Sequence, residues 1–266
     1  MKAERLRETL EVLIGSDARP VVTYAALWPF MRAMEEIPVN DIPQTILNLL
    51  INVVGSNRSL LMPTFASGYK NGICNLDKEP STTGLLSELF RKHPQTRRSL
   101  SAFFSFNILG PETPGVVSLQ PKNAWGDGSM YEWMEKNNVH FLMLGTHPTS
   151  CSYLHRMEWL NRDIINYRYD KRFEGILLRE GTEYPVQETL YVRSLNPPVI
   201  NDYTVIYNDL KKGGMSVVML DGVYIAHMRA EDMKNVYMKL LKKDPFLTVQ
   251  NRCEFESLVN GSSCDK

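Results

Sequence analysis

The sequence predicts a single-domain protein of the α/β class, and three observations lead to that prediction. The chain has 266 residues, which is long for one domain and short for two. Residues 21–27, 42–54 and 59–64 follow one another as a buried apolar strand, a helix with periodic apolar positions and a second strand. No repeat, linker or change of composition marks a boundary. We therefore assign residues 1–250 to one domain and residues 251–266 to a polar tail.

The other elements continue this alternation. The first residues form a charged helix, and Gly55 ends the helix at residues 42–54. Residues 65–98 are an irregular connection with one helix at residues 84–92, and so long a connection in a compact domain usually serves a function. We expect further strands at residues 103–109, 141–145, 175–179, 188–193, 216–220 and 223–227, and further helices at residues 130–137, 202–213 and 230–242.

Composition excludes several classes of function. Thirty basic and thirty acidic residues cancel, and no basic stripe is present, so nucleic acid is not an expected partner. The first residues form neither a signal peptide nor a membrane span, so we expect a cytoplasmic protein that does not bind membranes. The four cysteines lack zinc spacing, and His147 with His155 matches no zinc pattern, so we predict no metal site.

One pair of residues suggests acid–base chemistry. His155 and Glu158 are three residues apart on a predicted helix, so both side chains point to one face. The preceding strand ends at Leu144 and Gly145, which puts the helix near the carboxyl edge of a sheet, where α/β proteins bind ligands. An ordinary solvated helix-face pair is the alternative. Cys151, four residues before His155, could form a nucleophilic pair with it, although an inert buried thiol is the more usual outcome.

A set of co-linear motifs runs along nearly the whole chain and resembles the antibiotic N-acetyltransferase family, whose best-known members are aminoglycoside 3-N-acetyltransferases. The matching segments are residues 61–65, 77–80 and 83–85, Phe90 with Arg91 and Pro94, Arg98 with Ser99 and Ser105, Gly110 with Pro111, residues 126–129 and 144–145, Ser152 with His155 and Glu158, and residues 243–246.

The resemblance implies a three-layer α/β/α fold with a mixed central sheet, and transfer of acetyl from acetyl-CoA directly to an amine. His155 would be the general base, Glu158 would hold its ring, and Ser152 would donate to the developing oxyanion. The implied acetyl-CoA site comprises Tyr24, Ala25, Ala26, Leu27, Pro63, Thr64, Phe65, Arg98, Ser99 and Ser105. Asp77, Arg168 and Lys171 would bind the acceptor, and residues 167–173 resemble the branch of the family found with surface-sugar synthesis.

The chain also departs from the family pattern. Tyr24, Ala25 and Ala26 stand where the family usually has His-Ser-Ser, which removes an imidazole and two hydroxyls. Ser101 and Ala102 replace a His-Pro pair. These changes affect the implied acetyl-CoA site and leave the two residues of the acid–base pair in place.

We therefore predict an acyl-CoA-dependent N-acyltransferase whose acceptor is a small amine, either an aminoglycoside or an amino sugar. A degenerate member that binds a sugar or a protein partner in surface-polysaccharide synthesis is the alternative. A third is an O-acyltransferase or hydrolase that uses Ser101 or Ser105 with His155. Trp28, Phe30 and Trp133 are expected in the core, with an acceptor pocket or a homodimer contact as the alternatives.

Overall fold

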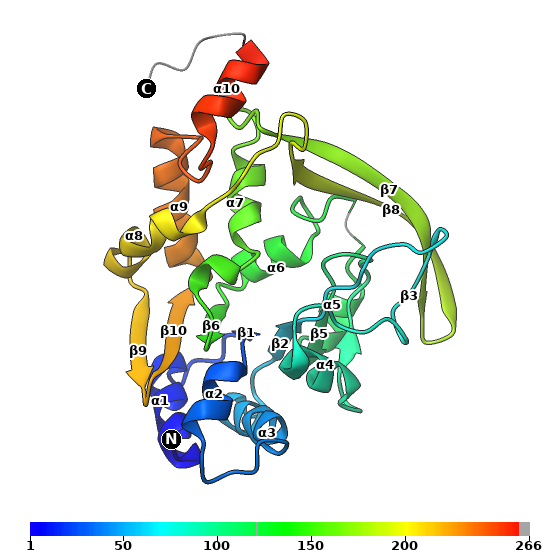
Figure 1. Ribbon diagram of the computed structural model, residues 1–266. Coiled ribbons are helices and arrows are strands. Elements are labelled where there is room, and N and C mark those ends of the chain that lie inside the picture. The colour runs from blue at the N-terminus through cyan, green and yellow to red at the C-terminus, as the bar shows by residue number, and fades with distance from the viewer. Residues whose placement is uncertain (121, 261–266) are drawn as a thin grey trace.

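The computed structural model describes residues 1–120 and 122–260, and its centre is a seven-stranded mixed sheet (Figure 1). Strands β2, β1 and β6 are parallel neighbours, and antiparallel strands extend the sheet on both sides. The order across the sheet is β4 (Arg97–Arg98), β5 (Phe106–Leu109), β2 (Leu60–Pro63), β1 (Val21–Ala25), β6 (His140–Leu144), β10 (Val223–Arg229) and β9 (Ser216–Leu220). The predicted mixed sheet is confirmed.

Helices cover both faces of this sheet because the strand side chains alternate between two apolar cores. Val21 and Leu60 belong to one core, and Val22 and Leu61 belong to the other. The first core includes residues of α1 (Ala3–Ile14), α2 (Trp28–Ala33), α3 (Ile42–Val54) and α4 (Leu85–Lys92). The second includes residues of α5 (Thr113–Val117), α6 (Met130–Lys136), α7 (Leu154–Leu160), α8 (Tyr207–Lys212) and α9 (Ala230–Lys243). Figure 1 shows the sheet between these two groups, so the three-layer α/β/α prediction is confirmed.

A second sheet forms an arm beside the domain. Strands β7 (Arg168–Arg179) and β8 (Thr182–Arg193) pair along their whole length as a hairpin, and β3 (Ile73–Asn75) adds to its distal half. Figure 1 shows the arm running from the region of α7 to β3. The predicted strands at residues 175–179 and 188–193 cover only part of this hairpin. The rest was missed because residues 168–174 are mostly polar or charged and lack an apolar alternation.

The segment after Asn251 differs from the prediction of a polar tail. Residues Arg252–Asn260 form α10, and Phe255 is buried against Phe246, with ring centroids 6.2 Å apart. Phe255, Leu258 and Val259 recur at helical spacing, a signal that the prediction of a tail did not use. Residues 261–266 of the predicted tail lie outside the described part of the chain. Phe30 is in the core as predicted, whereas Trp28 is 61% exposed.

Within the described ranges, no helix is both long and apolar enough to cross a membrane.

The pairing of β6 with β10 joins two histidines at the edge of the sheet opposite the one where His155 was predicted to lie. His140 Nδ1 lies 2.7 Å from His227 Nε2, and His140 Nε2 lies 2.9 Å from an Asp17 carboxylate oxygen. Burial, together with the charge on His140, lowers the pKa of His227 to about 4. His227 is therefore neutral in the native protein at neutral pH.

We expect His227 to make the protein less stable in mild acid. Below its ordinary pKa of 6.5 the unfolded imidazole binds a proton, whereas the native one stays neutral until about pH 4. The contribution of His227 to the free energy of unfolding is thus fully present above pH 6.5 and is lost as the pH falls toward 4. From this group alone, the free energy of unfolding should drop by about 1–2 kcal/mol between pH 8 and pH 5. Urea unfolding at both pH values should show a smaller drop for His227→Gln; equal drops in the two proteins would contradict this assignment.

Candidate functional site

The loops that follow β1 and β6 meet at the carboxyl edge of the parallel strands. Ala26 N donates a hydrogen bond to Leu144 O at 2.8 Å. Gly145 has a φ of +65°, and a Cβ atom there would lie only 2.4 Å from Ala26 O. Glycine is therefore required for this close approach. The loop after β6 then leads through Ser152 into α7, which carries His155 and Glu158.

His155 and Glu158 form the predicted pair. His155 Nδ1 lies 2.8 Å from Glu158 Oε2, and the His155 side chain is 28% exposed while that of Glu158 is fully buried. An ionised carboxylate only accepts hydrogen bonds, so Nδ1 carries the proton and Nε2 carries the lone pair. Among the described residues, none is hydrogen-bonded to His155 Nε2. The pair thus has the tautomer and the partial exposure that a general base needs.

Three further side chains surround the Glu158 carboxylate. Arg168 Nη2 lies 3.0 Å from Oε2, while Tyr203 and Tyr237 donate hydroxyl hydrogen bonds to Oε1 at 2.8 and 3.3 Å. Burial alone would raise the pKa of Glu158, but the Arg168 charge and the hydrogen bonds from His155 and Tyr203 lower it to about 2. Glu158 is therefore ionised at any physiological pH, and His155 is held by a fixed negative charge.

His155 lines a cavity of about 560 Å³ between α7 and the arm. The edge of the imidazole faces the Trp125 ring, with centroids 5.1 Å apart. Arg156 fixes this tryptophan segment by donating from Nη1 to Trp125 O at 2.6 Å. The other lining residues are Phe104, Arg168, Tyr169, Lys171, Phe173, Leu190, Tyr191, Val192, Arg193, Leu195, Ile200, Asn201 and Tyr203. The cavity is large enough for a sugar-sized ligand, and its lining is mostly aromatic and aliphatic.

Ser152 lies in the core rather than in this cavity. Its hydroxyl is 2.8 Å from both the Tyr24 and the Tyr131 hydroxyls, and all three residues are buried. Ser152 O accepts from the backbone N–H of His155 at 3.1 Å, so the two predicted residues share one turn of chain. A serine hydroxyl has two acceptor lone pairs and one proton, so both tyrosines can donate to Ser152 Oγ and leave its proton for another acceptor.

The residues of the implied acetyl-CoA site divide into two groups. Ala25, Ala26 and Phe65 are half-buried at the carboxyl edge of the sheet. The polar members turn inward and are satisfied within the protein. Thr64 bonds to Asn107, Ser99 accepts from Phe106 N, and Ser105 donates to Thr64 O. Tyr24, Leu27 and Pro63 are also buried.

Arg98 differs most from its predicted role of facing coenzyme A phosphates. Its guanidinium donates to the backbone carbonyls of Thr64, Leu76 and Glu79 and to the Ser105 hydroxyl, and the residue is 5% exposed. These bonds tie the irregular segment after β2 to the main sheet. Arg98 thus organises a loop, and its donors are not turned to solvent.

The three predicted acceptor residues do not share one cavity. Arg168 and Lys171 line the cavity at His155, where Arg168 also holds Glu158. Asp77 accepts a hydrogen bond from Glu180 N at the turn of the hairpin. Nine residues of strand separate that turn from Lys171, a span of roughly 30 Å, so Asp77 lies far from this cavity.

Other nucleophiles weighed from the sequence are engaged elsewhere. Ser101 donates to the buried Glu188 carboxylate, and Ser105 donates to Thr64 O. Burial raises the pKa of the Cys151 thiol to about 12, so a thiolate at that position is disfavoured.

His147 bonds to Thr149 in its own loop. Over the described residues, no cluster of three His, Cys, Asp or Glu side chains could hold a metal ion.

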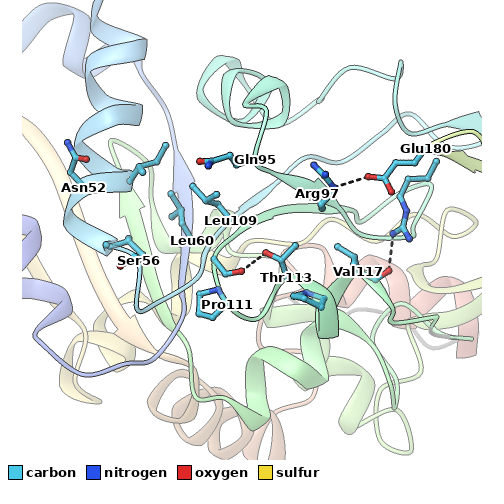
Figure 2. A pocket seen from close by; sticks show the side chains of 16 residues that line it. Asn52, Ser56, Leu60, Gln95, Arg97, Leu109, Pro111, Thr113, Val117 and Glu180 are labelled. Atoms are coloured by element: carbon cyan, nitrogen blue, oxygen red, sulfur yellow. Dashed lines mark hydrogen bonds and ion pairs between the residues drawn. The ribbon is translucent and has the colours of Figure 1, made fainter.

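A larger cavity, of about 990 Å³, lies away from His155 (Figure 2). It is lined by α3, β5, residues 110–117 and the hairpin turn, and Figure 2 shows the Arg97–Glu180 ion pair along its side, at 2.9 Å. The Arg179 guanidinium is occupied by the carbonyls of Arg98 and Val117. Among the described residues that line this cavity there is no histidine, and its one carboxylate, Glu180, is paired with Arg97. His155 lines the smaller cavity, which is therefore the candidate site.

Sequence reasoning missed Trp125, Tyr203 and Tyr237 as parts of the site. Tyr203 is 45 residues from Glu158 and Tyr237 is 79 residues from it, so no local spacing signals their contact. Trp125 directly precedes the matching segment at residues 126–129 but is not part of it.

Comparison with known proteins decides the family. The model of the aminoglycoside 3-N-acetyltransferase family matches residues 31–242 of the 266. The chain belongs to the aminoglycoside 3-N-acetyltransferase family. This membership confirms the resemblance seen in the motifs, the predicted enzyme class of N-acetyltransferase, and acetyl-CoA as the acyl donor of that class. No curated protein matches the chain.

Solved structures of aminoglycoside acetyltransferases have the same fold. One, named AAC(3)-Xa, has a TM-score of 0.75 at 17% identity, over 91% of this chain and 93% of that one. AAC-IIIb in a binary complex with CoASH has a TM-score of 0.73 at 17% identity, over 91% and 97% of the two chains. AAC-VIa bound to sisomicin has a TM-score of 0.72 at 19% identity, over 91% and 98%. At these identities the comparisons establish the fold of this family member.

The adjacent residues Arg97 and Arg98 allow a matched test of whether Arg98 holds the irregular segment after β2 in place. Arg98→Met should lower the free energy of unfolding by about 2–4 kcal/mol, because it leaves buried carbonyls without donors. Arg97→Met removes an ion pair whose arginine is 51% exposed and should cost under about 1 kcal/mol. Urea unfolding of both variants checks this. Equal small losses, with weaker acetyl-CoA binding by Arg98→Met, would instead restore the phosphate role.

Proposed function

We propose that this chain transfers acetyl from acetyl-CoA directly to the amino group of an aminoglycoside or amino sugar, with His155 as general base. The observation that carries the proposal is the His155–Glu158 pair at the wall of a sugar-sized cavity. Family membership supplies the reaction class. Because the reaction consumes acetyl-CoA, we assign it to the cytoplasm.

His155 Nε2 takes the proton from the amine as its nitrogen attacks the thioester carbon. The nitrogen–carbon bond forms, the carbon–sulfur bond breaks, and this proton passes to the departing coenzyme A thiolate. An amine with a pKa well above 7 is mostly protonated in water, so it first loses one proton to solvent and then a second proton to His155 as it attacks. Glu158 stabilises the imidazolium that forms, and Arg168 and Tyr203 keep Glu158 fixed. Ser152 is the proposed oxyanion donor, together with backbone N–H groups.

The acyl donor fits the protein best along Ala25, Ala26 and Phe65. These residues are the half-buried members of the implied acetyl-CoA site, at the carboxyl edge of the sheet. An apolar pantetheine chain can pack against them, and the phosphates of coenzyme A would have to find cations other than the inward-facing Arg98.

A non-catalytic family member that binds a sugar or a protein partner is the second candidate. The observation that favours it is the loss of exposed polar groups from the implied acetyl-CoA site, where alanines stand at two strand-end positions and the hydroxyls of Thr64, Ser99 and Ser105 are buried. Retention of an ordered His155–Glu158 pair favours the enzyme.

Replacing His155 with alanine distinguishes the two candidate functions. His155→Ala should keep acetyl-CoA affinity within about twofold and should lower kcat by about 10²- to 10⁴-fold, because only proton transfer is lost. Calorimetric titration of acetyl-CoA measures the affinity, and thiol release with amino sugars and aminoglycosides measures kcat. His147→Ala is the matched control, since that loop histidine does not line the cavity.

Two outcomes would contradict the enzyme. Absence of acetyl-CoA binding to the wild type would favour the binding protein. Thiol release that persists in His155→Ala at the rate of the control would remove His155 from the base role.

A further inference from the structure

We propose that the natural acceptor is an amino sugar that carries a phosphate or diphosphate group, rather than a polycationic aminoglycoside. This inference rests on the proposed function, because it names the acceptor class of the cavity at His155. The evidence for the inference is the charge of the residues that line the cavity.

The part of β7 that lines the cavity is basic and aromatic. Arg168, Tyr169, Lys171 and Phe173 line it, whereas Asp170 and Arg172 do not. Asp170 is hydrogen-bonded to Asn123 away from the cavity lining. The one acidic side chain in this part of β7 is thereby excluded, and a lysine is presented instead.

The charged residues that line the cavity are cationic. Arg168, Lys171 and Arg193 line it, and among the described residues no aspartate or glutamate does. Glu158, behind the wall, pairs with Arg168. Within the described ranges, neither Lys171 nor Arg193 has a carboxylate within ion-pair distance; Arg193 donates to Val199 O, and the Lys171 ammonium lies 5.3 Å from the centroid of the Phe173 ring. Two of the three cations are therefore available for an anionic ligand.

Arg168 is a fixed part of this wall. The Arg168 side chain is 6% exposed and is held by Glu158, so its position does not depend on the ligand.

A polycation does not suit these surroundings. Each ammonium of an aminoglycoside would meet like charge in a cavity without carboxylates, and this repulsion is strong where water is partly excluded. A phosphate or diphosphate matches several cations at once, and arginine is suited to its oxygens. The aromatic wall at Tyr169, Phe173 and Tyr191 provides faces for a sugar ring or a nucleobase.

The experiment compares four acceptors in the acetyl-CoA thiol-release assay: glucosamine 1-phosphate, uridine diphosphate-linked glucosamine, glucosamine and sisomicin. Wild type should have a kcat/KM at least about tenfold higher for the two phosphorylated amines than for glucosamine or sisomicin. Equal values for the two phosphorylated amines would mean that phosphate alone is recognised, and a higher value for the nucleotide sugar would add the base. Both results support the proposal.

Reversing the charge at Lys171 tests whether this residue recognises the phosphate group. Lys171→Glu should raise KM for the phosphorylated acceptors about tenfold more than it changes KM for glucosamine or acetyl-CoA. Lys239→Glu is the matched control, because this exposed α9 lysine is outside the cavity. A rise in KM for acetyl-CoA instead would mean that Lys171 serves the donor, which would overturn the proposal. The highest kcat/KM for sisomicin would also overturn it.

Direct binding separates failure of this inference from failure of the proposed function. If no amine releases coenzyme A, the enzyme proposal fails, and calorimetry with uridine diphosphate-linked glucosamine decides the ligand class. Binding that Lys171→Glu weakens about tenfold and Lys239→Glu does not would support a phosphorylated sugar ligand. Binding of sisomicin in preference would refute it, as would no binding of the nucleotide sugar.

Discussion

The ion pair between Glu158 and Arg168 is the interaction on which the site depends. It joins α7, on the main domain, to the first residue of the β7–β8 arm, and both side chains are almost fully buried. Removing one partner of such a pair typically costs about 3–5 kcal/mol, because it leaves an uncompensated buried charge. The same carboxylate orients His155, so one interaction sets both the position of the arm and the tautomer of the base.

A second constraint is the position of Arg98. Arg98 collects three backbone carbonyls and one hydroxyl, and so it orders the irregular segment that follows β2. A guanidinium with five donors suits this task. Several polar residues that the resemblance assigned to acetyl-CoA thus bond within the protein. Under the proposed function, the side chains of Ala25, Ala26 and Phe65 are left to contact the donor.

The arm gives this family member its particular cavity. Arg168 and Lys171 of β7 line the cavity and Asp170 does not, so this strand gives the cavity positive charge. The fold follows the family, and the proposed catalytic pair lies on α7, whereas part of the charge of the cavity wall comes from the arm. In the proposal, reaction class and acceptor class are therefore determined by different parts of the molecule.

The sequence by itself determined the parts of this protein that depend on local patterns. Apolar periods placed the core strands and helices, and the spacing of His155 and Glu158 on one helix predicted their contact. Co-linear motifs predicted the family. Tertiary structure alone decided the rest. Arg168, Tyr203 and Tyr237 reach Glu158 from elements 10 to 79 residues away, which no period encodes. The first half of β7, residues 168–174, is mostly polar or charged and shows no strand pattern, so its pairing with β8 is visible only in the folded chain. The inward turn of Arg98 likewise depends on carbonyls brought together only by folding.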